Sequence, residues 1–325
     1  MIDRPAPEAR PGPGMALVRL RSGGICGSDL SAYRGTSPMV SYPRVLGHEL
    51  LVDVAVCPER PELVGRRAVV EPLLPCGRCR ACRRGRSNCC SDLRVMGVHI
   101  DGGLAETALI ADRQLHAVPD DMPDDVAVLT EPVTVAYHAV QRAQIEAGQV
   151  AAIFGAGTIG LLIAHLVLRA RGCRALVVDV DPWRLEVAER IGATPLQGDA
   201  PSLIRSVGSA TGGEMADVVF EATGNAQCTR LTTDLVAQAG RIVLIGWNKG
   251  PTEVDTVSLM RKEVDLLGSR NSADAFPAVL RLLAAGLVDP ADLVTHRFTM
   301  GEAADALHLL DTGGGRALKV LIGGA

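Results

Sequence analysis

The sequence lacks the features that would direct a protein to a membrane or to a polyanion. Its 33 basic and 37 acidic residues give a formal net charge of −4, so neither sign of charge is in large excess. No apolar leader opens the chain, because residues 1–14 are polar and rich in proline. Glycines interrupt the long apolar stretch at residues 150–168, which disfavours a membrane span there. We therefore expect a small-molecule partner, with no nucleic acid and no membrane.

The length of the chain and its cysteine content further limit the class of protein. A chain of 325 residues with 47% apolar content suits two folded domains and excludes disorder. Several of its nine cysteines lie in one short segment, and the chain carries no export signal. This usage favours metal binding over disulfides and predicts a cytoplasmic protein.

A glycine pattern at residues 155–160 joins two apolar runs. We predict a buried strand at residues 150–154, a helix at 161–168 and a second parallel strand at 175–178. Gly155 allows the sharp turn, Gly157 lets a pyrophosphate approach, and Gly160 lets the helix pack against the strand. The helix N-terminus favours phosphate, and Asp179, about 20 residues after the last glycine, is placed to accept from ribose hydroxyls. The residues expected to bind a dinucleotide are Gly155, Gly157, Thr158, Ile159, Gly160 and Asp179.

The alternation of helices and strands continues after this unit. It predicts a doubly wound parallel sheet that extends to about Gly268. The further predicted elements are helices at 184–191, 276–285 and 303–310, and strands at 16–21, 217–220, 241–245 and 317–322.

A cysteine-rich loop carries the clearest metal signal. Four thiolates, from Cys76, Cys79, Cys82 and Cys90, can enclose a tetrahedral zinc with no open position, which is typical of a structural site. Cys89 could exchange with Cys90. Arginines at 78, 80, 83, 84 and 86 also fit a zinc knuckle that binds nucleic acid. We favour the simpler interpretation that they offset the negative charge of the thiolates, because no aromatic residue lies between them.

Scattered donors could form a second metal site. Cys26, His48, Glu49 and Glu131 offer ligand types that zinc accepts. Taken singly, each has an ordinary alternative: a small buried cysteine, a satisfied histidine, a solvated acid, and an acid at a helix start before Pro132. The residues alone leave these alternatives open.

In their order, these motifs closely resemble the zinc-dependent medium-chain alcohol and polyol dehydrogenases over nearly the whole chain. The resemblance implies an α/β fold in which a Rossmann doubly wound parallel sheet is inserted in a GroES-like, partly open β-barrel catalytic domain. It implies a catalytic domain at residues 1–132 with a zinc lobe at 76–90, an NAD-binding domain at 133–271, and a return to the catalytic domain at 272–325.

The resemblance also implies roles for the scattered donors. Cys26, His48 and Glu131 would bind a catalytic zinc, with Glu49 behind it or exchanging as a ligand. Glu131 stands where alcohol dehydrogenases have a second cysteine, as in the polyol branch. Ser28 would relay the proton and Asp29 would orient His48. Each chain would hold two zincs, one catalytic and one structural.

The resemblance favours NAD over NADP, because Asp179 would repel a 2′-phosphate. Arg184 would lie near the same ribose, and Lys319 near the cofactor. Ser31 replaces the histidine that often ends the proton relay, and the family's first strands would precede Met1, so either the start is misassigned or a sheet edge is missing.

The stretch at residues 41–49 and the Gly97-Val98-His99 turn look most like dehydrogenases of sugar acids such as L-galactonate. We therefore expect oxidation of a secondary alcohol on a polyol, sugar or sugar acid. The alternatives are a threonine or cyclitol dehydrogenase of the same family, and a non-catalytic NAD sensor. A homodimer or homotetramer is expected by analogy.

Overall fold

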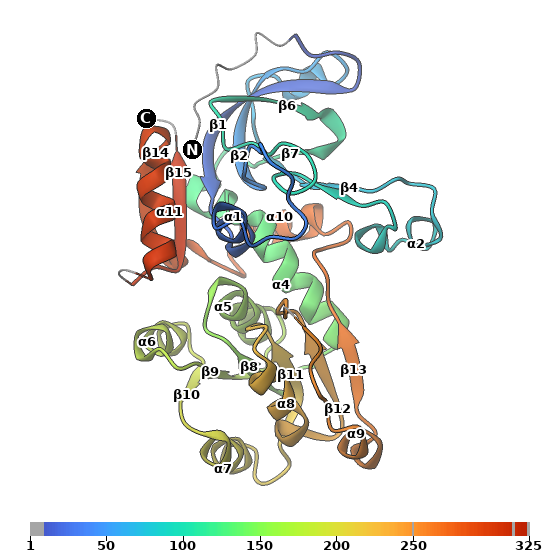
Figure 1. Cartoon of the computed structure of the whole chain (residues 1–325), viewed down its shortest axis with the longest axis vertical. Coiled ribbons are helices and arrows are strands. Elements are labelled where there is room, and N and C mark those ends of the chain that lie inside the picture. The colour runs from blue at the N-terminus through green and yellow to red at the C-terminus, as the bar shows by residue number, and fades with distance from the viewer. Residues whose placement is uncertain (1–9, 249, 314–315, 324–325) are drawn as a thin grey trace. The chain divides into compact units, whose positions relative to one another are not determined.

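The computed structural model describes residues 10–248, 250–313 and 316–323, so most of the loop expected at residues 1–14 lies outside the described residues. The chain forms two compact units: Met1–Glu131 with Ala273–Ala325 is unit 1, and Pro132–Ser272 is unit 2. Figure 1 labels their elements. Helix α4 (Thr130–Ala143) begins in unit 1 and continues into unit 2.

Unit 1 is organised around strand β1 (Met15–Gly24), which pairs antiparallel with three other strands. Buried and partly exposed residues alternate at its start, so one face packs into the core and the other is more exposed. The seven-stranded sheet has the order β14-β15-β1-β2-β3-β7, with β6 also paired to β1. Its other strands are β2 (Glu49–Val56), β3 (Arg67–Val70), β6 (Thr107–Ala111), β7 (Leu115–Ala117), β14 (Val294–Thr299) and β15 (Lys319–Gly323).

Short helices and a small lobe complete unit 1. The helices are α1 (Gly27–Tyr33), α3 (Asp124–Ala127), α10 (Phe276–Ala284) and α11 (Ala303–Thr312). The lobe contains strands β4 (Leu73–Leu74) and β5 (Arg94–Val95) and helix α2 (Arg80–Arg83). Helix α11 contacts α1 and strand β15, so the end of the chain packs against its beginning.

Unit 2 is a six-stranded parallel sheet with the order β10-β9-β8-β11-β12-β13. Its strands are β8 (Val150–Phe154), β9 (Arg174–Val178), β10 (Thr194–Leu196), β11 (Ala216–Glu221), β12 (Val236–Leu244) and β13 (Asp265–Gly268). The connecting helices are α5 (Thr158–His165), α6 (Pro182–Arg190), α7 (Ala200–Ala210), α8 (Ala226–Leu235) and α9 (Thr256–Lys262). The strand order reverses between β8 and β11, where such sheets bind ligands at their carboxyl edge.

The mixed sheet of unit 1 and the parallel sheet of unit 2 confirm the expected α/β fold. The helix predicted at residues 161–168 differs in its bounds, because α5 starts at Thr158 and the turn over Leu166–Ala170 is π-helical. Cys173 N donates to the carbonyl of Val167 at 2.9 Å, which leads the chain out of this wider turn towards β9. Among the described residues, no helix is both long and apolar enough to cross a membrane.

Close packing of Gly160 against the glycine turn generates a test of the fold. A Cβ at Gly160 would lie 1.8 Å from the carbonyl oxygen of Gly155, whereas a Cβ at Gly157 would meet no atom within 4 Å. We expect Gly160→Ala to cost about 1–3 kcal/mol of stability or more through overpacking. Gly157→Ala is the matched control and should leave the thermal midpoint of unfolding nearly unchanged. Equal midpoints for the two variants would contradict the packing.

Candidate active site

Three metal-ligating side chains meet at one end of the sheet of unit 1. One donor atom from each of Cys26, His48 and Glu49 lies within 4.8 Å of the other two. The pairing of β1 with β2 places Gly24 opposite Glu49, so Cys26, two residues beyond Gly24, comes close to the segment before β2. His48 and Glu49 are both buried. Antiparallel pairing therefore brings together residues that are more than 20 positions apart in the chain.

The buried carboxylate of Asp29 joins the two segments that carry these donors. Its Oδ2 accepts from the backbone N–H of Cys26 at 2.9 Å, and its Oδ1 accepts from that of Gly47 at 3.2 Å. The same Oδ1 lies 3.6 Å from His48 Nδ1, an ion-pair distance that is longer than a hydrogen bond. Burial by itself raises the pKa of Asp29, but the charge of His48 and these backbone donors outweigh it and lower the pKa.

His48 is held in an acidic environment. Burial by itself lowers the pKa of its imidazole, but the neighbouring Asp29 carboxylate and the Cys26 side chain raise it well above its ordinary value. His48 Nδ1 is a buried polar atom without a hydrogen-bond partner. A half-buried thiol, a buried imidazole and a buried carboxylate, with one donor atom of each within 4.8 Å of the other two, form a donor set that fits a bound divalent cation.

Glu49 is engaged by a buried lysine. Lys319 Nζ donates to the two carboxylate oxygens of Glu49 at 2.8 and 2.7 Å, and to the carbonyl of Ile25 at 3.2 Å. Burial lowers the pKa of Lys319, but the charge of Glu49 outweighs it and raises the pKa. A Cβ at Gly24 would lie 2.0 Å from Glu49 Oε2, so only glycine leaves room for this carboxylate. Lys319 therefore contacts the metal-ligand cluster through Glu49, and its expected place near the cofactor stays a prediction.

Glu131 belongs to the same buried environment. Burial raises its pKa to about 7, with a further contribution from the charge of Glu49, while His48 and Lys319 act in the opposite direction. Because α4 begins at Thr130, Glu131 is the second residue of the helix and lies within its first turn, instead of preceding the helix as a cap. The close cluster itself consists of Cys26, His48 and Glu49, and Glu131 is linked to it through these charges.

Helix α1 carries the residue expected to relay a proton. Ser28 lies in its first turn, two residues after Cys26, and is partly buried. Ser31 Oγ donates to the carbonyl of Gly27 at 3.1 Å, so its hydroxyl is directed into its own helix. This contact gives Ser31 a local role in the helix.

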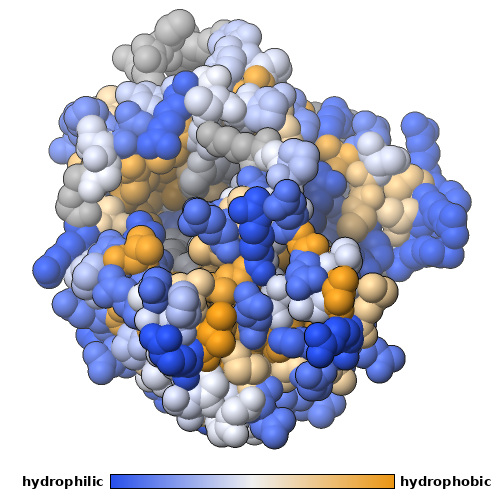
Figure 2. Space-filling view, turned by 60° about the horizontal axis from the view of Figure 1, so that its bottom comes forward, coloured by the Kyte–Doolittle hydropathy of each residue, from blue (hydrophilic) through white to orange (hydrophobic). Residues whose placement is uncertain are grey.

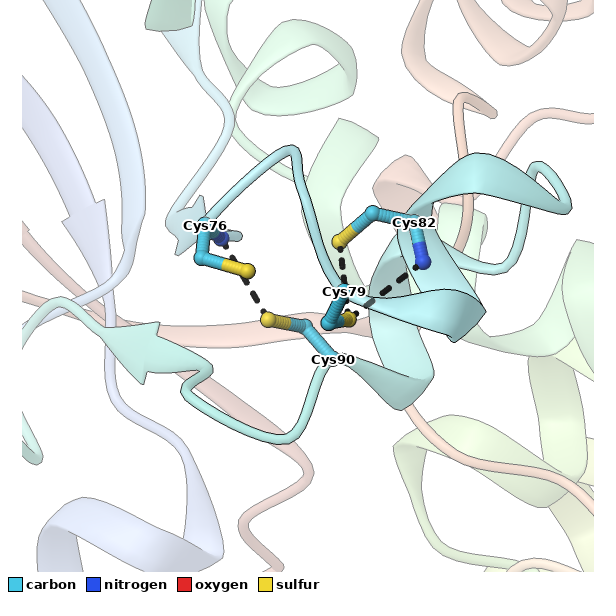
Figure 3. Close-up of side chains that lie close together, drawn as sticks. All are labelled: Cys76, Cys79, Cys82 and Cys90. Carbon is cyan, nitrogen blue, oxygen red and sulfur yellow. Dashed lines mark hydrogen bonds between the residues drawn. The ribbon is translucent and has the colours of Figure 1, made fainter.

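The lobe of unit 1 gathers the predicted structural cysteines. One sulfur from each of Cys76, Cys79, Cys82 and Cys90 lies within 4.8 Å of the others. Figure 3 shows these side chains pointing towards one another from the loop and from α2. Cys79 and Cys82 sulfurs are 3.5 Å apart, and Cys90 Sγ accepts from the backbone N–H groups of Cys76 and Asp92 at 3.3 Å. Cys89 is exposed and lies outside this cluster.

The pKa values of the lobe thiols diverge strongly. The backbone N–H groups of Cys82 and Ser91 lower the pKa of Cys79 to about 5, whereas burial and the Cys79 and Cys90 side chains raise the pKa of Cys82 to about 12. Four thiols packed this closely cannot all ionise without a cation. Their donor set therefore fits a structural zinc. The arginines of the lobe lie mostly at its surface, which is largely hydrophilic at the right of Figure 2.

In unit 2 the glycine turn lies at the carboxyl end of β8. Gly155 adopts φ +98°, a left-handed conformation that favours glycine, and Gly157 caps α5. Thr158 and Ile159 open that helix. Asp179, directly after β9, accepts from the backbone N–H of Ala156 at 2.6 Å and from that of Asp181 at 2.9 Å. Its carboxylate thus supports the glycine turn itself, and its role towards ribose stays a prediction.

Arg184 lies in the first turn of α6, beside the same edge. Its Nε lies 3.6 Å from Asp181 Oδ2, and both side chains are partly exposed. Asp181 also caps α6 by accepting from the backbone N–H of Trp183 at 3.0 Å. Acidic side chains therefore dominate the carboxyl end of β9.

Comparisons with known proteins find matches in both units. Residues 12–120 match the family described as alcohol dehydrogenase GroES-like domain, and residues 158–285 match the zinc-binding dehydrogenases. The L-galactonate-5-dehydrogenase of Escherichia coli K12 is 35% identical, with 91% of this chain and 87% of that protein covered. Sorbitol dehydrogenase of Bacillus subtilis is 31% identical, with coverages of 94% and 89%.

Solved structures give the same result. An alcohol dehydrogenase, RspB, from E. coli CFT073 in complex with NADH has a TM-score of 0.92 and 33% identity, covering 97% of this chain and 93% of its own. A zinc-binding dehydrogenase from Sinorhizobium meliloti bound to NADP has a TM-score of 0.89 and 29% identity, with coverages of 97% and 93%. The chain belongs to the zinc-type medium-chain alcohol and polyol dehydrogenases.

Two features of this dehydrogenase were not identified from the sequence: the buried partner of Lys319 and a role for Glu221. Lys319 stands alone as a charge in the apolar run Leu318–Ile322, which is the signal that a buried partner should exist. Its partner, Glu49, is 270 residues away in the chain. Glu221, at the end of β11, was not assigned a role, although an acid that ends a buried strand is an unusual feature.

The lobe of the dehydrogenase provides a test with a matched control. Cys79→Ser removes a thiol of the four-cysteine cluster, so we expect it to lose one zinc per chain and to lower the thermal midpoint. Cys89→Ser changes a neighbouring exposed thiol and should retain both the zinc content and the midpoint. Metal analysis by mass spectrometry, with thermal unfolding, measures both quantities. Loss of zinc from both variants alike would contradict the assignment of Cys89 outside the cluster.

Proposed function

We propose that this dehydrogenase oxidises a secondary alcohol of a polyol, sugar or sugar acid by hydride transfer to NAD. The observation that carries the proposal is the close cluster of the half-buried Cys26 with the buried His48 and Glu49, with Glu131 in the same charged environment. A closed structural site needs four protein ligands, whereas a catalytic zinc keeps a position open for substrate. We assign Cys26, His48 and Glu131 as catalytic-zinc ligands and the lobe cysteines as a second, structural site.

Each residue around the proposed zinc site has its own part in the reaction. A zinc ion held there would supply the Lewis acidity that lowers the pKa of a substrate hydroxyl, and NAD would accept the hydride. Asp29 holds Cys26 and His48 in place through the two backbone contacts of its carboxylate. Lys319 engages both carboxylate oxygens of Glu49, which supports a place for Glu49 behind the ligands. We assign Ser28 Oγ as the group that takes the proton from the substrate hydroxyl.

The preference for NAD rests on the acids after β9. A 2′-phosphate near Asp179 and Asp181 would meet negative charge, and Asp181 already engages Arg184. One relative of this fold is bound to NADH and another to NADP, so we assign the choice of coenzyme in this chain to these acidic side chains.

The substrate class rests on the relatives that carry polyol and sugar-acid names, L-galactonate-5-dehydrogenase and sorbitol dehydrogenase. We propose a homodimer or homotetramer, supported by the position of β13 as the last strand of its sheet among the described residues, and by the exposed Met260 and Val257 of the neighbouring helix α9. Light scattering measures the mass of the oligomer in solution.

The lobe thiols must stay reduced to bind zinc, which supports a cytoplasmic location.

A substrate panel tests the activity. The panel contains L-galactonate, sorbitol, threonine and a cyclitol, each with NAD and with NADP, and NADH formation is followed by absorbance. We expect the highest kcat/KM with a sugar acid or polyol and NAD. Cys26→Ser and Glu131→Ala should lower kcat by at least about a hundredfold, because each removes a group that acts on the transition state. Activity that survives complete metal removal would refute the zinc mechanism, and no turnover on any alcohol would favour the sensor.

Zinc affinity should depend on pH through Glu131. Its pKa of about 7 means that it holds a proton below that pH, and the raised pKa of His48 adds a second proton to be displaced. We expect zinc affinity at the catalytic site to fall as pH drops below about 7, by about tenfold per unit for each proton released. Zinc titration of protein with a loaded lobe measures this slope. Glu131→Gln should bind zinc more weakly with a shallower slope, and an unchanged slope would contradict the role of Glu131.

A further inference from the structure

The carboxylate of Glu221 occupies an unusual position in unit 2. Glu221 ends strand β11 in the middle of the parallel sheet and is 1% exposed. Its Oε1 accepts from the backbone N–H of Thr223 at 2.8 Å, from that of Gly224 at 3.0 Å, and from the Thr223 hydroxyl. A single oxygen thus satisfies three donors of the loop that follows β11.

The backbone of Glu221 holds a second loop. Its carbonyl accepts from the N–H groups of Ile245 and Gly246 at 2.9 Å, just after β12. A Cβ at Gly246 would lie 2.0 Å from Gly224 N and 2.8 Å from Glu221 Oε2. The loops after β11 and β12 therefore touch through their backbones around this one acid, with no space for a side chain at Gly246.

The same loop touches the glycine turn. A Cβ at Gly155 would lie 2.9 Å from the methyl group of Thr223, and Ala222 N donates to the carbonyl of Phe154 at 3.0 Å. Thr223 is thus packed against the turn at the end of β8 while its hydroxyl and N–H are held by Glu221. The carboxyl edge of three adjacent strands, β8, β11 and β12, is joined through Glu221 and Thr223.

We propose that Glu221 is a positioning residue for the dinucleotide, because its carboxylate holds Thr223 and Gly224 in the arrangement that keeps the Gly155 turn ready for the pyrophosphate. The proposal rests on the assignment of unit 2 as the NAD-binding unit. Ordering a loop before the ligand arrives removes an entropic cost from binding. Without the carboxylate, three donors lose their acceptor and the loop must rearrange to find others.

Cofactor binding to three variants tests this role. Glu221→Ala removes the acceptor, Glu221→Gln keeps one oxygen of the same reach, and Glu214→Ala deletes an exposed acid just before the opposite end of β11. Calorimetry with NADH gives Kd, and steady-state rates give KM for NAD and kcat. We expect Glu221→Ala to raise Kd and KM by about tenfold or more, the effect of a buried donor left unsatisfied.

The pattern across the variants separates positioning from a general loss of stability. Glu221→Gln should recover Kd to within about threefold of the wild type, since its amide oxygen can still accept from the backbone N–H groups of Thr223 and Gly224. Glu214→Ala should match the wild type. For Glu221→Ala, kcat at saturating NAD should fall much less than KM rises. A role in stability alone would lower the thermal midpoint and leave Kd of the folded protein unchanged, and that result would overturn the proposal.

A second variant keeps the test decisive if Glu221→Ala does not fold. Thr223→Val deletes only the hydroxyl and keeps the shape of the side chain that packs against Gly155, so it should raise Kd for NADH by a smaller factor, about threefold to tenfold. Wild-type affinity in Thr223→Val would then overturn the proposal. If the wild-type protein binds neither NADH nor NADPH, the proposed function fails with it. If the wild type binds and Glu221→Ala binds equally well, only the positioning role fails.

Discussion

The structure depends on carboxylates, buried or partly buried, that accept backbone N–H groups where strands end. Asp29 does so for the segments that carry Cys26 and His48, through contacts at 2.9 and 3.2 Å. In unit 2, Asp179 accepts from Ala156 at 2.6 Å and Glu221 accepts from Thr223 at 2.8 Å. Loops at the end of a sheet have no ladder partners for their N–H groups, and a fixed carboxylate supplies the missing acceptor. The loops at these strand ends are therefore held in place by side chains to which no chemical step of the proposed reaction is assigned.

The cluster in unit 1 is costly for the protein to maintain. His48, Glu49, Asp29 and Lys319 are buried together, and the raised pKa of Glu131 records how unfavourable one more negative charge is there. Buried charges persist only when paired or when they coordinate a metal. The Lys319 pair neutralises Glu49, and a divalent cation would neutralise the rest. In the lobe, backbone N–H groups lower the pKa of Cys79, whereas burial and the neighbouring thiols raise that of Cys82, so a cation would be needed to hold all four as thiolates.

Much of this could be anticipated from the chain itself. The spacing of Cys76, Cys79, Cys82 and Cys90 is local, so the loop that joins them can bring their sulfurs together over a short distance. The glycine turn at residues 155–160 is equally local, because strand, turn and helix follow one another directly. Helix bounds were less accurate, as α5 shows, because the π-helical turn at Leu166–Ala170 has no distinct composition. For Cys26, His48 and Glu131, the residues alone allowed ordinary alternatives, and only their order along the chain indicated a shared site.

The sequence by itself predicted the four-cysteine lobe, the glycine turn and the α/β alternation, because each arises from residues close together in the chain. The tertiary structure alone decided which distant groups meet. Lys319 reaches Glu49 because β15 and β2 both pair with β1, a consequence of sheet order that no local pattern encodes. Glu221 joins the loops after β11 and β12 because parallel strands place their carboxyl ends at one edge. Strand pairing over long separations is set by the packing of the whole unit, and it created the contacts that support each site.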